Sequence, residues 1–202
     1  MHISEGVLSA PVLLTGAGLA IAGSAVGLKR MDFEQVAQTG ILAAAFFVAA
    51  LVHVPIGPSS VHLILNGLVG LLLGWAAFPA VLVALTLQAV FFQFGGITTL
   101  GVNTVIMAAP AVVCHHIFAP WIWKRPVLAA AAAFACGSLA VCGGALLVAL
   151  ALMFTEESFL EIAVMIVLAH LPVMIVEGIV TAICVGFLKK VQPAMLPGYG
   201  GS

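Results

Sequence analysis

The sequence predicts an all-α integral membrane protein, a single bundle of transmembrane helices, on three observations. Of its 202 residues, 64% are hydrophobic and only 6% are charged, whereas a soluble domain carries about a quarter charged residues. The mean hydropathy is +1.30. The apolar runs are continuous and rich in Ala, Leu and Gly, which favours helices over the alternating strands of a barrel. These properties exclude an ordinary soluble enzyme, a disordered chain and, at a formal net charge of −1, a nucleic-acid-binding protein.

Seven apolar segments approach the length of about 20 helical residues that crosses the hydrocarbon core of a bilayer. The third and fourth are short and meet at Phe78 and Pro79, where we expect a tight turn. The last segment is long, and Pro172 inside it predicts a tilt or a kink. The predicted spans are 8–28, 36–53, 61–77, 79–94, 101–121, 127–153 and 160–188.

The basic residues predict the orientation of this seven-helix bundle. They occur as three pairs that follow the first, fifth and seventh predicted spans, so all of them lie on one side of the membrane. Positive charge is concentrated on the cytoplasmic side. We therefore predict a multi-pass protein of the cell's inner (plasma) membrane, with its N-terminus outside and its C-terminus in the cytoplasm. The pairs are Lys29/Arg30, Lys124/Arg125 and Lys189/Lys190.

The whole chain, residues 1–202, is expected to form one domain, because its length suits one compact bundle. The Pro- and Gly-rich end, residues 193–202, is expected to be a flexible tail.

This topology brings polar residues from three separate segments to the outer face. These segments are the N-terminus, the connection after the second span and the connection after the fourth span. The polar residues are His2, Glu5, His53, His62 and Asn103.

A His directly after a free N-terminal residue is a metal chelator. The α-amine of Met1, the amide nitrogen of His2 and its imidazole Nδ1 would close two fused rings around one ion. Tetragonal nitrogen coordination favours Cu(II) or Ni(II). A second imidazole would fill the fourth corner, and His62 and His53 are the candidates; the alternative for both is a histidine at the membrane interface. Binding weakens in acid, because the amine has to lose a proton from a pKa near ~8.

Further polar residues lie within the predicted spans. Asn66 follows His62 by one turn, so both face the same way. His170 and Glu177 lie two turns apart on one face of the last span. A carboxylate in mid-span costs roughly 2.5–3.5 kcal/mol on insertion scales and should face the bundle interior with a partner. Glu177 is therefore either a relay or coupling group, or half of a structural buried polar pair.

The first span carries the small-residue pairs Gly16/Ala20 and Gly23/Gly27, which permit close helix packing. They could meet another helix of this chain or a different subunit.

The sequence contains no HExxH, GxSxG or P-loop motif, so we expect no enzyme and no ATP hydrolysis by this chain. Any energy for active transport would come from a partner or from an ion gradient.

Four segments of the sequence resemble the NikM/CbiM family in order and spacing. This family comprises the substrate-binding (S) components of energy-coupling factor (ECF) transporters for nickel and cobalt. The resemblance runs from Met1 to about Pro193. The segments are MHISEGVLS, VPIGPSSVHLILNGLVG, FGGITTLGVN and AHLPVMIVEGIVT.

The resemblance implies a seven-helix bundle whose N-terminal segment, residues 1–7, enters from outside and binds the metal. It implies that Met1 supplies its α-amine, His2 its amide and imidazole nitrogens, and His62 the fourth nitrogen. His53 matches no ligand position of the family, so we place it at the periphery. A supporting or pathway role is left to Asn66 and to three residues that match polar positions of the family, Asn103, His170 and Glu177.

The resemblance also implies a substrate and partners. The loop FQFGGITTLG differs from the FGDGG-like loops of the cobalt branch, and planar nitrogen ligation suits Ni(II) better than Co(II). We therefore expect Ni(II) as the transported substrate, with Co(II) as the alternative, and no organic cofactor. The implied partners are a transmembrane coupling (T) subunit, two ABC ATPase subunits and a small accessory membrane protein. The lipid bilayer surrounds the chain, and no nucleic acid is expected.

The alternative function is a stand-alone secondary metal permease, with His170 and Glu177 as a proton relay. An intramembrane enzyme acting through Glu177 would be a third class, but no nucleophile motif supports it.

Overall fold

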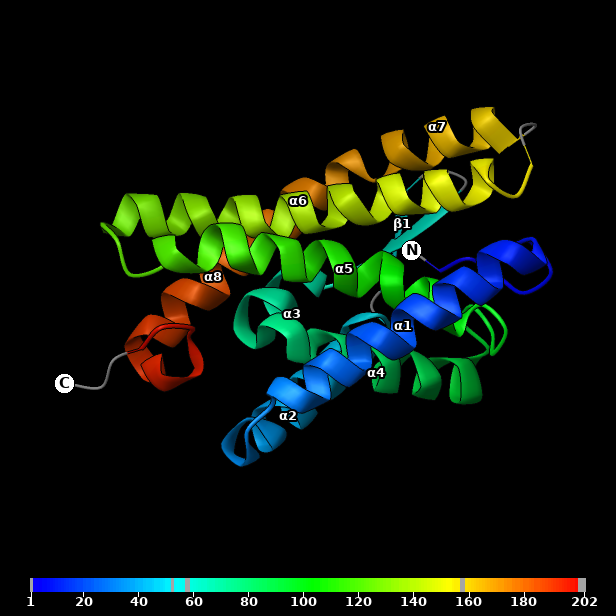
Figure 1. Ribbon diagram of the computed structural model, residues 1–202. Helices are drawn as coiled ribbons and strands as arrows, with labels where there is room; N and C mark the ends of the chain where they lie inside the picture. The colour runs from blue at the N-terminus through cyan, green and yellow to red at the C-terminus, as the bar shows by residue number, and fades with distance from the viewer. Residues whose placement is uncertain (1, 52, 57–58, 157–158, 200–202) are drawn as a thin grey trace.

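The computed structural model describes residues 2–51, 53–56, 59–156 and 159–199, and for its two strands it describes the main chain. Its helices pack into one bundle, which confirms the all-α prediction (Figure 1). The helices are α1 (Ala10–Arg30), α2 (Phe33–Ala49), α3 (Asn66–Leu73), α4 (Ala77–Phe92), α5 (Leu100–Phe118), α6 (Pro126–Met153), α7 (Leu160–Ala169) and α8 (Leu171–Val191).

Five segments of the described chain are long and apolar enough to cross a membrane. α2 is also apolar but shorter, at 17 residues. Each of these segments overlaps at least one predicted span, whereas the number of crossings, seven, stays a prediction. The five segments are Ala10–Arg30, Asn66–Phe92, Leu100–Trp121, Pro126–Met153 and Leu160–Val191.

The chain reverses direction between α3 and α4, although the two count as one apolar segment. At the start of α3, Asn66 donates to the carbonyl of Met107 at 3.3 Å, and near its end the carbonyl of Leu71 accepts from His115 Nδ1 at 2.8 Å. α3 therefore runs parallel to α5. α4 packs on α5 in the opposite sense, because the short loop 93–99 joins the end of one helix to the start of the other.

This reversal falls slightly earlier than the sequence predicted. It lies in a 3-10 turn, η1 (Gly74–Ala76), where Gly74 has φ 55° and a side chain would crowd the His115 ring. Such a left-handed conformation favours glycine. Pro79 lies in the first turn of α4, where its missing N–H leaves no helical hydrogen bond unmade.

A short antiparallel hairpin departs from the helical pattern. It connects α2 to α3 and pairs β1 (His53–Ile56) with β2 (Ser59–His62), so that His53 lies opposite His62. The sequence did not predict this pairing, although its Pro-Gly-Pro-Ser composition marked the segment as a connection.

The long seventh predicted span is divided, as the proline in it predicted. α7 ends at Ala169 and α8 begins at Leu171, with His170 between them and Pro172 in the first turn of α8. Proline cannot donate the amide that would continue the preceding helix.

The three basic pairs gather at one end of the bundle, which we call the basic end. Arg30 lies 5.4 Å from the centre of the Trp75 ring, and Lys189 lies 5.3 Å from that of Trp123, beside the Lys124/Arg125 pair. The N-terminal segment and the 93–99 loop lie at the opposite end (Figure 1). The predicted topology requires all three basic pairs on one side of the bundle, and they lie there. Which compartment this side faces stays a prediction.

The C-terminal residues 193–199 fold against the basic end, where the sequence suggested a flexible tail over 193–202. Leu196 is only 3% exposed. Trp123 Nε1 donates to the carbonyl of Pro197 at 2.7 Å, and Gln38 Nε2 donates to that of Met195 at 3.0 Å. A buried apolar anchor and two hydrogen bonds from other segments hold these residues, which sequence composition alone does not reveal. Residues 200–202 lie outside the described chain.

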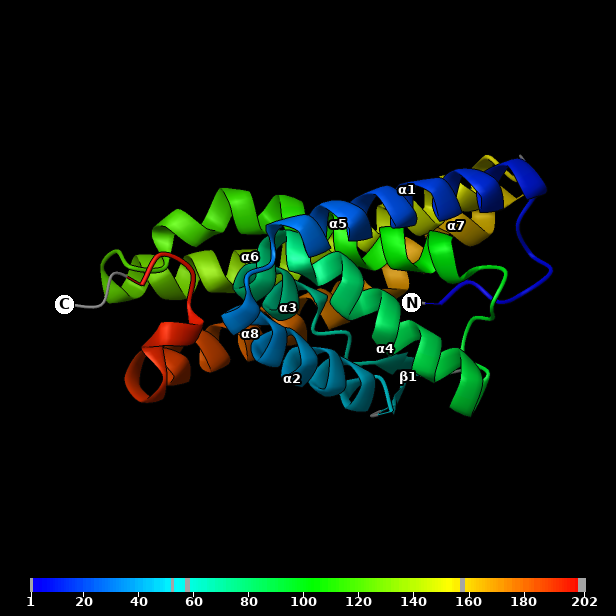
Figure 2. The same cartoon turned by 60° about the horizontal axis from the view of Figure 1, so that its bottom comes forward.

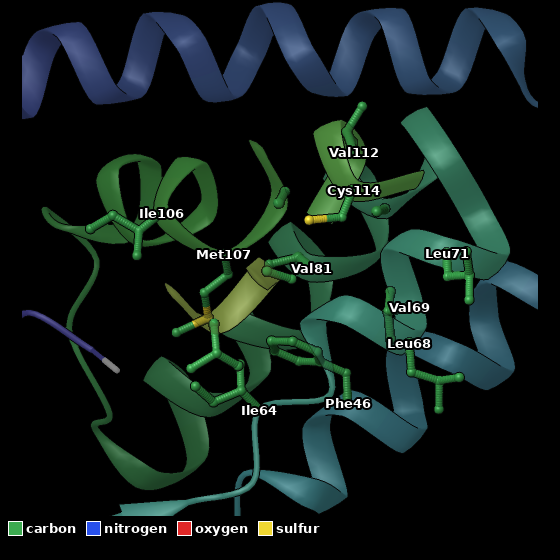
Figure 3. Packing of buried hydrophobic residues seen from close by; sticks show 14 of the residues in the cluster. Phe46, Ile64, Leu68, Val69, Leu71, Val81, Ile106, Met107, Val112 and Cys114 are labelled. Carbon is green, nitrogen blue, oxygen red and sulfur yellow. The ribbon is translucent and has the colours of Figure 1, made fainter. Parts of the chain in front are cut away.

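The small residues of α1 meet other helices of the same chain. Gly16 lies against Val102 of α5, and Gly23 lies against the ring of Phe78 in α4; in both places a Cβ would collide with its neighbour. The core beneath contains Phe46, Ile64 and Met107, contributed by α2, the segment before α3, and α5 (Figure 3). This packing fixes α4 and α5 side by side under α1.

Candidate metal-binding site

The N-terminal segment turns back from α1 and enters the bundle between α4 and α5 (Figure 2). The Ile3 amide donates to Asn103 Oδ1 at 3.0 Å, and Asn103 Nδ2 donates to the Ile3 carbonyl at 3.1 Å. The side-chain amide of Asn103 thus binds one residue of the segment as a neighbouring strand would. Ile3 is 6% exposed and Asn103 is 2% exposed. The sequence predicted that Asn103 and His2 share a face, and the structure brings their segments together.

Two glycines of the 93–99 loop make room for this segment. Gly95 has φ 75°, and a Cβ there would lie 2.8 Å from Asn103 Nδ2. Gly96 has φ 144°, and a Cβ there would overlap the side chain of Glu5. The Glu5 amide donates to the Gly95 carbonyl at 3.1 Å, and Glu5 Oε1 accepts from the Thr98 amide at 3.0 Å. The Gly-Gly pair therefore permits both a left-handed backbone and close approach of the N-terminal segment.

His2 lies deeper than Glu5, one turn inside the end of α4. Its Nε2 is 2.8 Å from Oε1 of Gln88, and its ring centre is 6.0 Å from that of Phe94. An amide oxygen can only accept a hydrogen bond, so Nε2 carries the proton. The remaining ring nitrogen, Nδ1, then holds the lone pair. Nδ1 is the atom that the predicted chelate requires.

The other predicted ligands are placed only in part. Met1 lies outside the described residues, as do the side chains of His53 and His62, whose main chains end the hairpin strands. Within the described part of the chain, no three His, Cys, Asp or Glu side chains gather as a metal site would. The predicted set draws only two side chains into the site and takes its other nitrogens from the main chain, so it would not form such a cluster.

Glu177 holds the chain directly after His62. Its carboxylate, fully buried in α8, accepts from the amide of Ile64 and from that of Leu65, at 2.9 Å to Oε1 and 3.0 Å to Oε2. These amides precede α3, and Leu65 caps that helix with φ 56°. Hydrogen bonds from main-chain amides compensate the burial of a carboxylate. Glu177 was expected to be either a relay group or half of a structural buried pair. Its partner in the structure is the main chain near the predicted ligand His62.

His170 is not joined to Glu177. Its Nδ1 donates to the carbonyl of Ile166 at 2.7 Å, at the C-terminal end of α7. In the part of the chain that the structure describes, no hydrogen bond connects the two side chains. The direct proton relay that their spacing suggested is therefore absent from this conformation.

Asn66 has a packing role in the structure. Its Nδ2 donates to the carbonyls of Met107 and Ala140 at 3.3 and 3.2 Å, and its Oδ1 accepts from the Gly67 amide at 2.9 Å. These bonds join the start of α3 to α5 and α6. Asn66 therefore fixes the position of the helix that follows His62.

Sequence reasoning missed Gln88, the residue that contacts the His2 ring. It stands as a single Gln within the apolar run AFPAVLVALTLQAVFF of α4. A polar side chain inside a membrane helix marks a functional position by default, so that signal was present. Its contact with His2 could not be predicted, because it depends on how far the N-terminal segment enters.

A family model described as the cobalt uptake substrate-specific transmembrane region, CbiM, matches residues 2–195. The chain belongs to the CbiM family. This finding confirms the resemblance drawn from the four sequence segments. The family transports metal ions across membranes and is not an enzyme family, so the chain is a multi-pass membrane protein of a cobalt and nickel transport family.

Individual relatives of this CbiM-family chain carry related names. A "Putative metal transport protein" of Haemophilus influenzae is 45% identical over 97% of each chain. A "Fused nickel transport protein NikMN" of Rhodobacter capsulatus is 36% identical over 54% of this chain and 33% of its own length. The crystal structure of a transition metal transporter superposes with a TM-score of 0.76 at 28% identity, over 96% of this chain and 94% of that one. The structural similarity therefore agrees with the transport family. Which metal ion the chain binds depends on the chemistry of its site.

Proposed function

We propose that this chain captures Ni(II) at its N-terminal end, as the substrate-specific component of an ATP-driven ECF transporter in the plasma membrane. The observation that carries the proposal is the inserted N-terminal segment. Gln88 binds Nε2 of His2 within this segment, so that Nδ1 carries the lone pair of the ring.

The proposed site holds the ion with four nitrogens in one plane. Met1 supplies the α-amine, His2 its amide nitrogen and Nδ1, and His62 an imidazole nitrogen. Planar nitrogen coordination suits Ni(II) better than Co(II) and leaves Co(II) as the weaker substrate. The anchoring of the chain after His62 by Glu177 supports a contribution from His62, because it holds the main chain next to this residue in place.

The proposed topology has seven crossings, with the N-terminus outside and the basic end in the cytoplasm. The hairpin and α3 together make the third crossing, and α7 with α8 makes the seventh. The collection of all three basic pairs at one end supports this orientation through the positive-inside rule. The metal then enters from outside at the end opposite to the basic pairs.

Transport would require partners that supply energy. The sequence carries no ATP-binding motif, so ATP hydrolysis falls to two ABC ATPase subunits, linked through a transmembrane coupling subunit and accompanied by a small accessory membrane protein. The rival proposal, a proton-coupled permease, needs His170 and Glu177 to exchange a proton. The carboxylate of Glu177 bonds main-chain amides instead, which supports a positioning role. Nickel uptake by the lone reconstituted chain under a proton gradient would favour the rival.

The decisive test compares the purified chain that begins at Met1 with a variant that has one Gly inserted before Met1. The insertion moves the free amine away and breaks the fused chelate while sparing the fold. We expect the native chain to hold one yellow, planar Ni(II) and the extended chain to hold none, as measured by metal content and visible absorption. Equal binding by both would show that Met1 is not a ligand.

A further inference from the structure

Gln88 occupies an unusual place in α4. It is fully buried among apolar residues, and the only hydrogen-bond partner of its side chain in the described part of the chain is the His2 ring, through Oε1. Its side-chain Nε2 has no hydrogen-bond partner among the described residues. Burying an unpaired amide N–H costs roughly 1–3 kcal/mol, so an apolar side chain would serve the packing of α4 better. The contact with His2 is therefore the feature that distinguishes this Gln.

The amide oxygen of Gln88 distinguishes the two neutral tautomers of His2. The tautomer with hydrogen on Nε2 donates to this oxygen, whereas the other tautomer would place two lone pairs against each other. A chelate that includes the His2 amide nitrogen uses Nδ1, because that nitrogen closes a six-membered ring. The tautomer that donates to Gln88 is the one that keeps the proton on Nε2 and the lone pair on Nδ1.

Gln88 also ties the ring to the loop that covers it. Its main-chain carbonyl accepts from the Phe94 amide at 3.3 Å, and the Phe94 ring lies 6.0 Å from the His2 ring. One residue thus fixes the imidazole through its side chain and the neighbouring aromatic ring through its main chain. Both contacts restrict the rotation of His2 about its side-chain bonds.

We propose that Gln88 is a positioning residue of the metal site, which holds His2 in the Nε2–H tautomer and in the ring orientation that aims Nδ1 at the ion. This inference rests on the proposed function for its metal and deepens it. A bound cation polarises the imidazole and strengthens the Nε2–H donor, so the hydrogen bond to Gln88 favours the loaded state. Partners of this kind typically change metal affinity by about 10–100-fold.

The test uses three variants of the full chain with its native N-terminus. Gln88→Leu removes the acceptor at similar volume, and Gln88→Glu restores an acceptor oxygen. Gln38→Leu makes the same chemical change at the basic end, where Gln38 bonds the Met195 carbonyl. The first measurement is the nitrogen chemical shifts of His2 in the metal-free protein, labelled at histidine, which report the tautomer. The second is the dissociation constant of Ni(II).

We expect metal-free native protein and Gln88→Glu to hold His2 as the Nε2–H tautomer, and Gln88→Leu to show a mixture. We expect Gln88→Leu to weaken Ni(II) binding by roughly 10–100-fold, Gln88→Glu to recover most of it, and Gln38→Leu to bind as the native chain does. A native tautomer and native affinity in Gln88→Leu would overturn the inference. If Gln88→Leu does not fold, Gln88→Glu decides: a tautomer mixture in that variant overturns the proposal.

The two proposals fail separately in this design. If the native chain does not bind Ni(II), the proposed function fails, while the tautomer comparison in metal-free protein still tests Gln88. If the native chain binds Ni(II) but its His2 carries hydrogen on Nδ1, the function stands and the role of Gln88 is wrong.

Discussion

Single polar side chains of α4 and α5 hold the N-terminal segment. Asn103 uses both ends of its amide on Ile3, and Gln88 uses its oxygen on His2. Each of these contacts joins the N-terminal segment to a different helix, α5 or α4. The position of His2 therefore depends on a few polar atoms in an otherwise apolar wall, and their loss should affect metal binding before it affects the fold.

Replacing Asn103 with Leu should weaken Ni(II) binding with a small effect on stability. Two buried hydrogen bonds to Ile3 are lost, each worth about 1 kcal/mol net, so we expect roughly a 30-fold higher dissociation constant. Asn66→Leu is the matched comparison, because Asn66 bonds α5 and α6 instead of the N-terminal segment. It should lower the midpoint of thermal unfolding more than Asn103→Leu does. Equal effects of the two variants on affinity would contradict this division.

At the scale of elements, two short pieces of irregular chain at helix ends are held by hydrogen bonds from other segments. The 93–99 loop receives Glu5 through two hydrogen bonds, and the segment before α3 is held by Glu177 of α8. Irregular main chain at membrane depth requires such internal partners, because lipid offers none. The geometry of the metal site thus depends on the loop after α4 and the segment before α3 more than on the packed faces of the helices.

Gly96→Ala should displace the N-terminal segment. A Cβ at this position overlaps the Glu5 side chain, and the φ of 144° is strained for any residue with a side chain. We expect at least tenfold weaker Ni(II) binding, since roughly 1.4 kcal/mol of strain already corresponds to a factor of ten. Gly18→Ala is the control, because nothing lies within 4 Å of a Cβ there; it should bind as the native chain does. Native affinity in Gly96→Ala would show that the segment can bind without Glu5 seated.

Glu177→Gln should weaken both stability and metal binding. The amide retains one acceptor oxygen but turns its NH2 group toward main-chain donors, so at least one buried amide loses its partner at a cost of about 1–3 kcal/mol. The bonds to Ile64 and Leu65 hold the chain near His62, so their loss should also weaken metal binding. Glu161→Gln, exposed on α7, is the control. Thermal unfolding and Ni(II) titration of both variants provide the measurement, and equal behaviour of the two would refute the anchoring role.

The whole molecule separates its two ends by function. The N-terminal end carries the inserted segment, and the basic end carries the three cationic pairs and the folded C-terminal residues 193–199. Between these ends, α3, α4 and α5 contribute Leu71, Val81 and Met107 to the most buried part of the core (Figure 3). A change confined to the basic end should alter stability without changing the affinity for metal.

Leu196→Ala tests this separation. Leu196 is 3% exposed, and truncation of a buried Leu costs about 2–5 kcal/mol in a closely packed site. We expect a lower midpoint of thermal unfolding and an unchanged dissociation constant for Ni(II) in the folded protein. Val191→Ala is a nearby control with an exposed side chain and should leave both quantities unchanged. A weaker Ni(II) affinity in Leu196→Ala would show that the two ends are coupled in the unliganded chain.

Hydropathy and charge predicted the helical bundle and the gathering of Lys29/Arg30 with the other basic pairs, because burial in lipid and the positions of charges leave few alternatives. They also placed His2 and Asn103 on one face. They missed the hairpin, the exact turn at Gly74–Ala76 and the folded residues 193–199, since strand pairing, a left-handed glycine and tail packing depend on contacts distant in sequence. Gln88 was missed for the same reason: its partner lies 86 residues away.

The first residues of this chain behave as a tethered ligand. His2 and Ile3 are bound by side chains of α4 and α5, while a short stretch ending at Ser9 keeps them attached to α1. A short tether keeps the attached group at a high effective concentration, on the order of millimolar or above. The segment could therefore leave its groove with an ion, exchange it and return without any helix changing place. The lifetime of the bound metal would then be set by how often this segment detaches from α4 and α5.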